Sequence, residues 1–315
     1  MKEFAERIER DYPVRHKEKE KVNFRTWLVH TLKELGYSPR LEGGASALTM
    51  GGNMTNVVVG DIERAKIVLA AHYDTGVREI LPPLLCPTRP ATFLLYQALF
   101  PFLVIAVSFL VSFGVTFALN LPNMTLPLFL LFLVVALFYP KYGKSERDNL
   151  NDNTSGVVAL LEVAKTLTPR YCGEVCFLFL DGGTQASKGA KGLVRAHPEL
   201  KKKSVIVLDC VGEGDELLIL PGRTSRWNDS LLDTILENFS NSEKKTCFLK
   251  TDGLVYYPSD NRAFAGGTAI CACKTVKGFG RCILPRCAKE IDEENLSLLC
   301  DGLCKLVTYY RPQNA

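Results

Sequence analysis

Two polar motifs carry the residue types of a metal site. The motif HYDT at residues 72–75 ends an apolar run, and NDNTSG at residues 151–156 opens a segment with helical spacing. A third candidate, Asp209, closes the apolar run VIVL, where a lone acid would be costly to bury. Imidazole nitrogens and carboxylate oxygens are zinc ligands. His72, Asp152 and Asp209 therefore predict a metal site.

Each of these residues also has a purely structural explanation. His72 could be hydrogen-bonded at a turn, and Asp152 could cap the helix that begins beside it. If His72 is a ligand, Asp74 is placed two residues away to orient the imidazole through its second nitrogen. The three candidate ligands carry more weight together than any one of them does alone, so we expect them to lie close together in the fold.

The order of these motifs resembles that of the M28 family of co-catalytic zinc aminopeptidases. That family has a strand ending in HxD, a D-(D/N)-x-S-G helix start, a strand followed by paired glutamates, an aspartate-ended strand, a serine–aspartate loop and a late histidine. The resemblance extends over roughly residues 20–310, apart from an uncharged insert. It implies that His72 and Asp209 bind the same metal, that Asp74 orients His72, and that Asp152 bridges two metals.

The resemblance also implies the fold and the chemistry. The implied fold is an α/β/α sandwich around a mostly parallel or mixed sheet, and the uncharged insert separately predicts an inserted two-helix transmembrane hairpin. The cofactor is zinc, and the reaction is removal of an amino-terminal residue from a peptide. Alternating strands and helices independently favour such a sandwich, and sites in these sheets gather at the carboxyl ends of strands.

The chain departs from the family's pattern where catalysis depends on it. The strand that ends at Asp181 aligns with the strand before the glutamate pair, but the pair falls on Gly183 and Thr184. The resemblance implies that the first glutamate is the general base and the second a ligand of the other metal. Gly183 has no side chain that accepts a proton, and Thr184 offers only a neutral hydroxyl. We therefore expect no conventional catalytic residue.

The late histidine is missing too. Counting back from Asp292 places Cys282 at its position, and a small gap would move the match to Leu284 or Pro285. A thiolate at Cys282 could bind zinc, whereas no histidine follows His197 in the chain. The second metal has therefore lost its glutamate and its histidine, while the ligands of the first metal are retained.

Two further acidic positions bear on the chemistry. Ser259 and Asp260 match the family's serine–aspartate loop, with Asn261 in place of the usual following histidine. Glu213, just after Asp209, is a candidate substitute base that a flexible loop could bring to the site. The simpler interpretation of Glu213 is a polar turn.

The insert at residues 90–140 contains no Asp, Glu, Lys, Arg or His. A helix needs about 20 apolar residues to cross a hydrocarbon core of about 30 Å. Residues 93–119 supply one span and residues 126–139 a shorter one. A buried hairpin in a soluble core is the alternative. Basic residues flank the two spans and the turn carries no charge, so the positive-inside rule predicts a two-pass protein with its M28-like domain in the cytoplasm. The flanking residues are Arg78, Arg89, Lys141, Lys144 and Arg147.

Composition excludes several classes of protein. The net charge of +4 comes from scattered residues, so we expect no nucleic-acid partner. The N-terminus is charged and has no secretory signal, so the eleven cysteines are expected to be reduced thiols. A separate cysteine–zinc site is disfavoured, because the spacing matches no standard zinc knuckle. The cysteines considered for it are Cys271, Cys273, Cys282 and Cys287.

The insert divides the M28-like domain into residues 1–89 and 141–315. We predict a helix over residues 1–38, and paired strands at 55–59 and 66–71. Further strands are predicted at 174–180, 204–208, 216–220 and 268–273, and further helices at 155–167, 187–196, 230–239 and 293–309.

Three functions are compatible with this pattern. In the favoured one, the chain is a membrane-anchored, M28-like protein with lost or strongly reduced aminopeptidase activity. It binds the bilayer through residues 93–139, a peptide or protein ligand at the old cleft, and one Zn²⁺ or other divalent metal. In the second, it is an active metal-dependent hydrolase with a substitute base such as Glu213. In the third, it is a purely structural interaction protein, and hydrogen bonds satisfy His72 and the aspartates.

Overall fold

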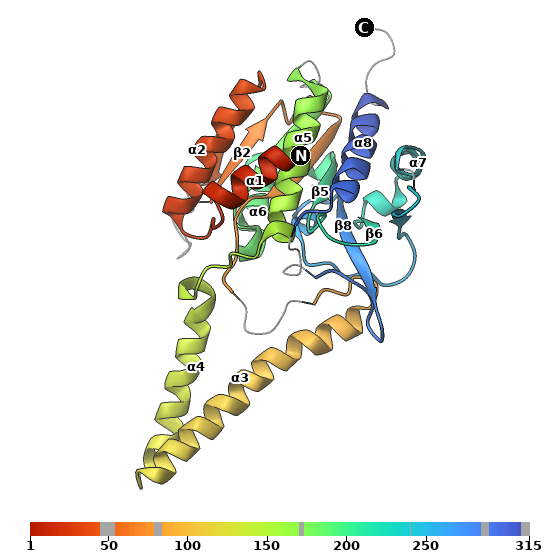
Figure 1. Cartoon of the computed structure of the whole chain (residues 1–315). Helices are drawn as coiled ribbons and strands as arrows, with labels where there is room; N and C mark the ends of the chain where they lie inside the picture. Colours follow the sequence, from red (N-terminus) through yellow and green to blue (C-terminus); the bar gives the residue numbers. More distant parts are fainter. Residues whose placement is uncertain (45–53, 79–83, 170–172, 240, 285–289, 310–315) are drawn as a thin grey trace.

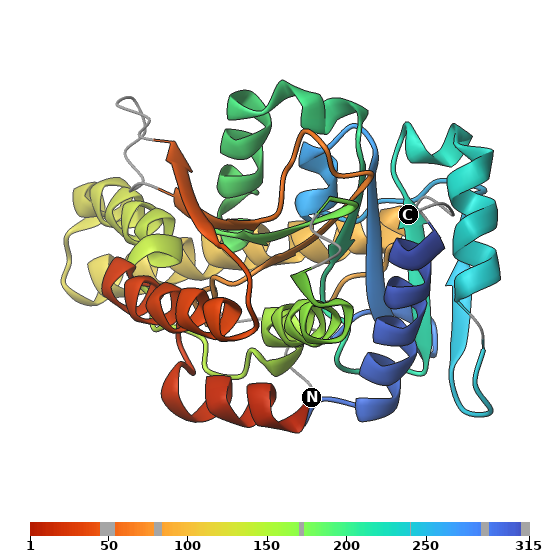
Figure 2. The ribbon, with the colours of Figure 1, turned by 90° about the horizontal axis from the view of Figure 1, so that it is seen from above.

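The chain folds around one mixed β-sheet with helices on both faces (Figures 1 and 2). The computed structural model describes residues 1–44, 54–78, 84–169, 173–239, 241–284 and 290–309. The strand order is β1-β2-β4-β3-β5-β8-β6-β7, and β9 pairs with β8. The strands are β1 (Arg40–Gly44), β2 (Met54–Val59), β3 (Ile67–His72), β4 (Val175–Leu180), β5 (Ser204–Leu208), β6 (Glu216–Pro221), β7 (Thr246–Leu249), β8 (Gly267–Val276) and β9 (Gly280–Cys282).

The centre of the sheet is parallel, and this arrangement positions the site. β4, β3, β5 and β8 run in the same direction, whereas β2 and β6 are antiparallel to the neighbours that join them to this centre. All residues of β3 and β4 are buried, as expected for strands covered on both faces. The carboxyl ends of β3 and β5 therefore lie side by side at one edge.

The two faces of the sheet are covered by different helices. Along β4, Val175, Phe177 and Phe179 pack into one apolar cluster with α1, α2, α5, α7 and α8. Cys176 and Leu178 point the other way, into a cluster with α6. Figure 2 shows α6 (green) on the opposite side of the sheet from α2 and α5. These helices are α1 (Lys2–Asp11), α2 (Glu18–Glu34), α5 (Ser155–Leu167), α6 (Lys188–Ala196), α7 (Asp229–Asn238) and α8 (Glu293–Tyr309).

The predicted helix over residues 1–38 is wrong, because the chain forms two helices there. α1 ends at Asp11 and α2 begins at Glu18. Pro13, which lacks a backbone N–H, lies in the break. Arg15 in the same segment is fully buried and donates to the carbonyl oxygens of Tyr73 and Tyr12.

The predicted pairing of the strands at 55–59 and 66–71 is also wrong. Both strands exist, as β2 and β3, but β4 lies between them. β2 pairs with β4 in the antiparallel sense, and β3 pairs with β4 in the parallel sense. The other predicted strands and helices are present with shifts of a few residues at their ends, whereas β1, β7 and β9 were not predicted.

Two apolar helices leave the layered domain as a hairpin. α3 (Pro90–Ala118) and α4 (Thr125–Tyr142) extend away from the sheet and meet at their far ends, where the hydroxyls of Thr116 and Thr125 are 2.7 Å apart (Figure 1). Only 6% of the most apolar part of α3 is buried, so this helix is not the core of a soluble domain. Among the described residues, α3 alone is long and apolar enough to cross a membrane. The apolar part of the second segment, Pro122–Ala136, is shorter.

Candidate metal centre

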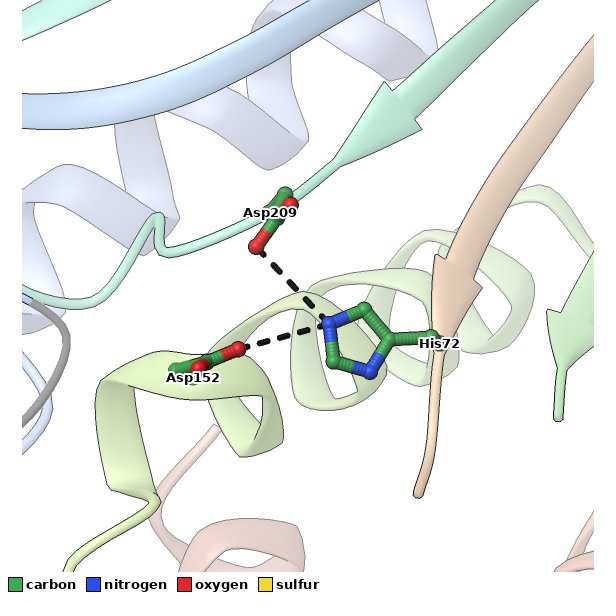
Figure 3. Close-up of side chains that lie close together, drawn as sticks. All are labelled: His72, Asp152 and Asp209. Atoms are coloured by element: carbon green, nitrogen blue, oxygen red, sulfur yellow. Dashed lines mark ion pairs between the residues drawn. The ribbon is translucent and has the colours of Figure 1, made fainter. Parts of the chain in front are cut away.

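The carboxyl ends of two neighbouring parallel strands bring His72 and Asp209 together. His72 is the last residue of β3, and Asp209 directly follows β5, which pairs with β3. Asp152 comes from the turn Leu150–Thr154, which precedes α5. Figure 3 shows the three side chains converging from these elements. The structure thus brings together all three residues that the sequence predicts as ligands.

The three side chains are spaced as ligands of one metal ion. Nε2 of His72 lies 3.3 Å from Oδ1 of Asp152 and 3.8 Å from Oδ1 of Asp209. Ligands bound tetrahedrally to zinc at about 2.0–2.2 Å are separated by about 3.3–3.6 Å. The side chains present therefore fit a single divalent ion. His72 and Asp209 are buried, whereas the side chain of Asp152 is 38% exposed, so the group is open to solvent beside Asp152.

The imidazole of His72 is oriented through Nδ1. This nitrogen lies 3.1 Å from the backbone carbonyl oxygen of Asp74 and 3.5 Å from its Oδ1. A proton donated from Nδ1 leaves Nε2 facing Asp152 and Asp209. Burial opposes protonation of His72, but hydrogen bonds to the three aspartates raise its pKa well above the usual value. The acidic groups around His72 therefore favour its protonated form when no metal is bound.

Asn153 fixes the relative positions of the elements that carry the ligands. Its Nδ2 donates to the carbonyl oxygen of Leu208 at 2.8 Å, at the end of β5. Its Oδ1 accepts from the backbone N–H groups of Gly156 and Cys210. A Cβ at Gly156 would lie 2.5 Å from Oδ1 of Asn153, so the contact requires glycine. The sequence reasoning assigned Asn153 no role, although it stands next to Asp152.

The carboxylate of Asp74 accepts hydrogen bonds mainly from Gly183 and Thr184, the residues that the resemblance aligns with the glutamate pair. It accepts from the backbone N–H of Gly183 at 2.7 Å, from that of Thr184 at 3.1 Å and from the Thr184 hydroxyl at 2.5 Å. Burial tends to raise the pKa of Asp74, but His72, Thr184 and Gly183 together lower it to about 2. Thr184 is therefore a hydrogen-bond partner of Asp74.

Gly183 lies directly against the His72 side chain. A Cβ at residue 183 would lie 2.4 Å from Cγ and 2.6 Å from Cβ of His72. Such distances are far inside van der Waals contact, so any side chain at this position would displace the imidazole. The space that a catalytic glutamate needs is thus taken up by His72.

Asp260 is a further acidic residue of this region. Its side chain is buried, and neither carboxylate oxygen has a hydrogen-bond partner among the described residues. Burial raises the pKa of Asp260 to about 6, although the charge of His72 lowers it. Burial tends to raise the pKa of the nearby Asp209 carboxyl, but His72, with a smaller contribution from Ser259, lowers it. The match to a serine–aspartate loop was the sequence signal for this pair.

The two predicted substitutes lie outside the cluster. Sγ of Cys282 is 3.1 Å from Sγ of Cys86, and both thiols are buried. Glu213 accepts from Nζ of Lys274 at 2.5 Å and lines a separate pocket beside α1 and residues 290–294. Neither residue belongs to the group of potential metal ligands found in the part of the chain that the structure describes.

Of the remaining late positions, only Leu284 lies within the described residues. The carbonyl oxygen of Leu284 accepts from Nδ2 of Asn151 at 3.4 Å, so this part of the chain runs beside the turn that carries Asp152. Pro285 and Cys287 lie outside the described residues. No cysteine contributes to a cluster of three or more potential metal ligands within the described ranges.

Comparison with known proteins agrees with the resemblance seen in the motifs. Residues 141–280 match the family described as Peptidase family M28. The matched segment contains Asp152, Gly183, Asp209 and Asp260, and it begins where the uncharged insert ends. No curated protein sequence matches the chain.

Solved structures show the same fold at low sequence identity. Glutaminyl cyclase of Porphyromonas gingivalis superposes with a TM-score of 0.61 at 14% identity, covering 98% of this chain and 96% of that one. A Zn-dependent exopeptidase from Parabacteroides distasonis gives 0.57 at 13% identity, covering 96% and 94%. LapA aminopeptidase of Legionella pneumophila gives 0.56 at 11% identity, covering 97% and 69%. At these identities the likeness shows a shared zinc aminopeptidase-like fold.

Proposed function

We propose that this chain, whose residues 141–280 match Peptidase family M28, holds one divalent metal ion, Zn²⁺ or a similar cation, on His72, Asp152 and Asp209. We further propose that its aminopeptidase activity is lost or strongly reduced, and that it binds a peptide or protein ligand at the site. The observation that carries this proposal is the contact of Gly183 with His72, because it leaves no room for a base.

The residues present support one metal rather than two. His72, Asp152 and Asp209 offer ligand atoms within 4.8 Å of one another. At the second position, Thr184 bonds to Asp74 and Cys282 contacts Cys86. Removal of a general base alone lowers a rate by about 10²–10⁴-fold. The loss of a second metal lowers it further.

The chain's own residues still suit ligand binding. A bound divalent ion acts as a Lewis acid that attracts a carbonyl or carboxylate oxygen of a peptide. Asp74 and Asn153 hold the ligand-bearing elements in place, and the exposed part of Asp152 leaves a route from solvent. The described residues thus keep the groups that would hold a metal, whereas residue 183 carries no side chain to move a proton.

The proposal is tested with aminoacyl fluorogenic substrates and the detergent-purified full chain, supplied with Zn²⁺. The expected result is turnover at background level, unchanged in His72→Ala and Asp152→Asn. In parallel, fluorescent peptides should bind in a metal-dependent manner that both variants abolish. Peptidase-like turnover that is lost in His72→Ala and Asp152→Asn would contradict the proposed loss of activity. Absence of metal-dependent peptide binding would contradict the proposal that the site binds a peptide or protein ligand.

Asp260 supports a second candidate, a hydrolase with a substituted base. Its carboxylate is buried, lacks a partner among the described residues and lies within electrostatic reach of His72 and Asp209. Glu213 suits this role less well because Lys274 occupies its carboxylate. In this case Asp260→Asn would abolish hydrolysis while the bound metal stays, whereas Glu213→Gln would have little effect.

We also propose that residues 93–139 anchor the chain in a lipid bilayer with two passes and with the M28-like domain in the cytoplasm. The support is the exposed apolar surface of α3, which includes Leu95, Phe102 and Phe117. At about 1.5 Å per residue, its 29 residues reach about 44 Å, more than a hydrocarbon core of about 30 Å. The 18 residues of α4 reach only about 27 Å, so α4 needs local thinning of the bilayer to span it.

A further inference from the structure

Cys86 and Cys282 form a buried pair of thiols at the base of the hairpin. Their Sγ atoms lie 3.1 Å apart, although 196 positions separate them in the sequence. Both residues are almost fully inaccessible to solvent, at 1% and 0% exposure. A disulfide joins sulfur atoms at about 2.0 Å, so a shift of about 1 Å between the thiols brings them to bonding distance.

The backbone around the pair holds the two cysteines in register. Leu85 and Ile283 exchange backbone hydrogen bonds of 3.3 and 2.8 Å, forming a short antiparallel bridge beside the thiols. The backbone N–H of Tyr256 donates to the carbonyl oxygen of Pro87 at 3.0 Å. Because main-chain bonds on both sides fix the neighbouring residues, the closeness of Cys86 and Cys282 does not depend on their side chains alone.

The Cys86–Cys282 pair lies where the hairpin of α3 and α4 joins the layered domain. Cys86 lies three positions before Arg89, the residue that immediately precedes α3. Phe93 in the first turn of α3 packs on Tyr256 with ring centroids 5.5 Å apart. Cys282 ends β9, and two positions later Leu284 accepts from Asn151, next to Asp152. A covalent bond here would therefore tie the base of α3 to the segment that borders the candidate metal centre.

We propose that Cys86 and Cys282 are an oxidation site at which a peroxide forms an intramolecular disulfide, fixing the base of α3 to β9. Each thiol loses one hydrogen atom as the S–S bond forms, and hydrogen peroxide is reduced to two molecules of water. Burial, with a smaller contribution from Cys86, raises the pKa of Cys282 to about 12. Because the thiolate is the form that attacks peroxide, this raised pKa slows the oxidation of Cys282 at neutral pH, and the closeness of the two sulfur atoms directs the product to the disulfide.

The site is tested by mapping disulfides in the reduced full chain after treatment with hydrogen peroxide in detergent. Free thiols are alkylated without reductant, and peptides are identified by mass spectrometry. The expected product is a Cys86–Cys282 cross-link with a loss of two hydrogen atoms. Cys86→Ser and Cys282→Ser should abolish it, whereas Cys300→Ser, a buried cysteine of α8, should leave it intact.

A second measurement tests whether the disulfide makes the segment before α3 more rigid. Hydrogen exchange at residues 84–93 should slow on oxidation of the wild-type chain and recover with dithiothreitol. The proposal is overturned if the wild-type chain yields alkylated or separately oxidised Cys86 and Cys282, or if either forms its cross-link with another cysteine. Because the wild-type map decides this, the result does not depend on whether a serine variant folds.

Discussion

A Cβ atom on Gly183 would lie 2.4 Å from Cγ of His72. The position that the resemblance assigns to the catalytic base is therefore in contact with His72, one of the candidate metal ligands. The proposed loss of the base therefore involves more than one missing side chain, because the His72 imidazole fills the space beside residue 183. Restoring the base would require His72 and its hydrogen bond to Asp74 to move.

Gly183→Glu is accordingly expected to create no peptidase activity. The glutamate must push His72 out of place, which should weaken Zn²⁺ binding and lower the free energy of unfolding by about 1–3 kcal/mol. Metal titration and denaturant unfolding of the purified chain measure the two effects. Gly192→Ala is the control, because a Cβ at this position on α6 meets nothing within 4 Å. Gain of aminopeptidase turnover in Gly183→Glu would show that the site retains space for a base.

Asp260 is expected to make stability depend on pH. Its pKa is about 6 in the folded protein and about 3.9 in the unfolded chain, so the folded protein binds a proton more tightly. The contribution of the Asp260 carboxyl to the free energy of unfolding is fully present below about pH 4. It falls as the pH rises to about 6, and it remains lost at higher pH. The loss corresponds to roughly 3 kcal/mol for about two pKa units.

Asp260→Asn removes this titration in the metal-free protein. The stability of the variant relative to wild type should increase between about pH 4 and 6 and remain constant above that range. Urea unfolding at a series of pH values in the presence of a chelator measures this difference. Asp252→Asn, at an exposed position, should show no comparable increase. A difference independent of pH would mean that the Asp260 carboxyl is not buried in this environment.

The turn of the hairpin is expected to lie outside the cytoplasm. An epitope inserted between Leu121 and Pro122 should be reached by antibody in intact cells, because the turn carries no charge while basic residues flank the two helices on the other side. An epitope at the C-terminus should be reached only after permeabilisation. If both epitopes need permeabilisation, the two-pass topology is wrong.

The cluster of His72, Asp152 and Asp209 could be predicted because the position of a strand's last residue in the sheet follows from the sequence pattern. His72 and Asp209 each close an apolar run, and the carboxyl ends of adjacent parallel strands meet at one edge. The NDNTSG motif indicated a helix start, and this placed Asp152 next to the first turn of that helix. These signals are local, so they survive in a chain that shares little sequence with its structural relatives.

Other features depended on long-range contacts that no local pattern specifies. β4 inserts between β2 and β3 although it follows the hairpin in sequence, so pairing of the two sequential strands was the natural but wrong prediction. Cys282 could be placed only by counting across gaps, and its partner Cys86 precedes the hairpin. The role of Asn153 depends on its contact with the end of β5, which its own sequence neighbourhood does not reveal.

The most direct test of the central claim is the number of metal ions bound per chain. Elemental mass spectrometry on the detergent-purified full chain should find one divalent ion in the wild type and none in His72→Ala. His30→Ala, at an exposed histidine of α2, should retain the ion. Two ions per chain would contradict the account, because a second site would then have been rebuilt. No ion in the wild type would also contradict it and would favour a purely structural role for the His72 cluster.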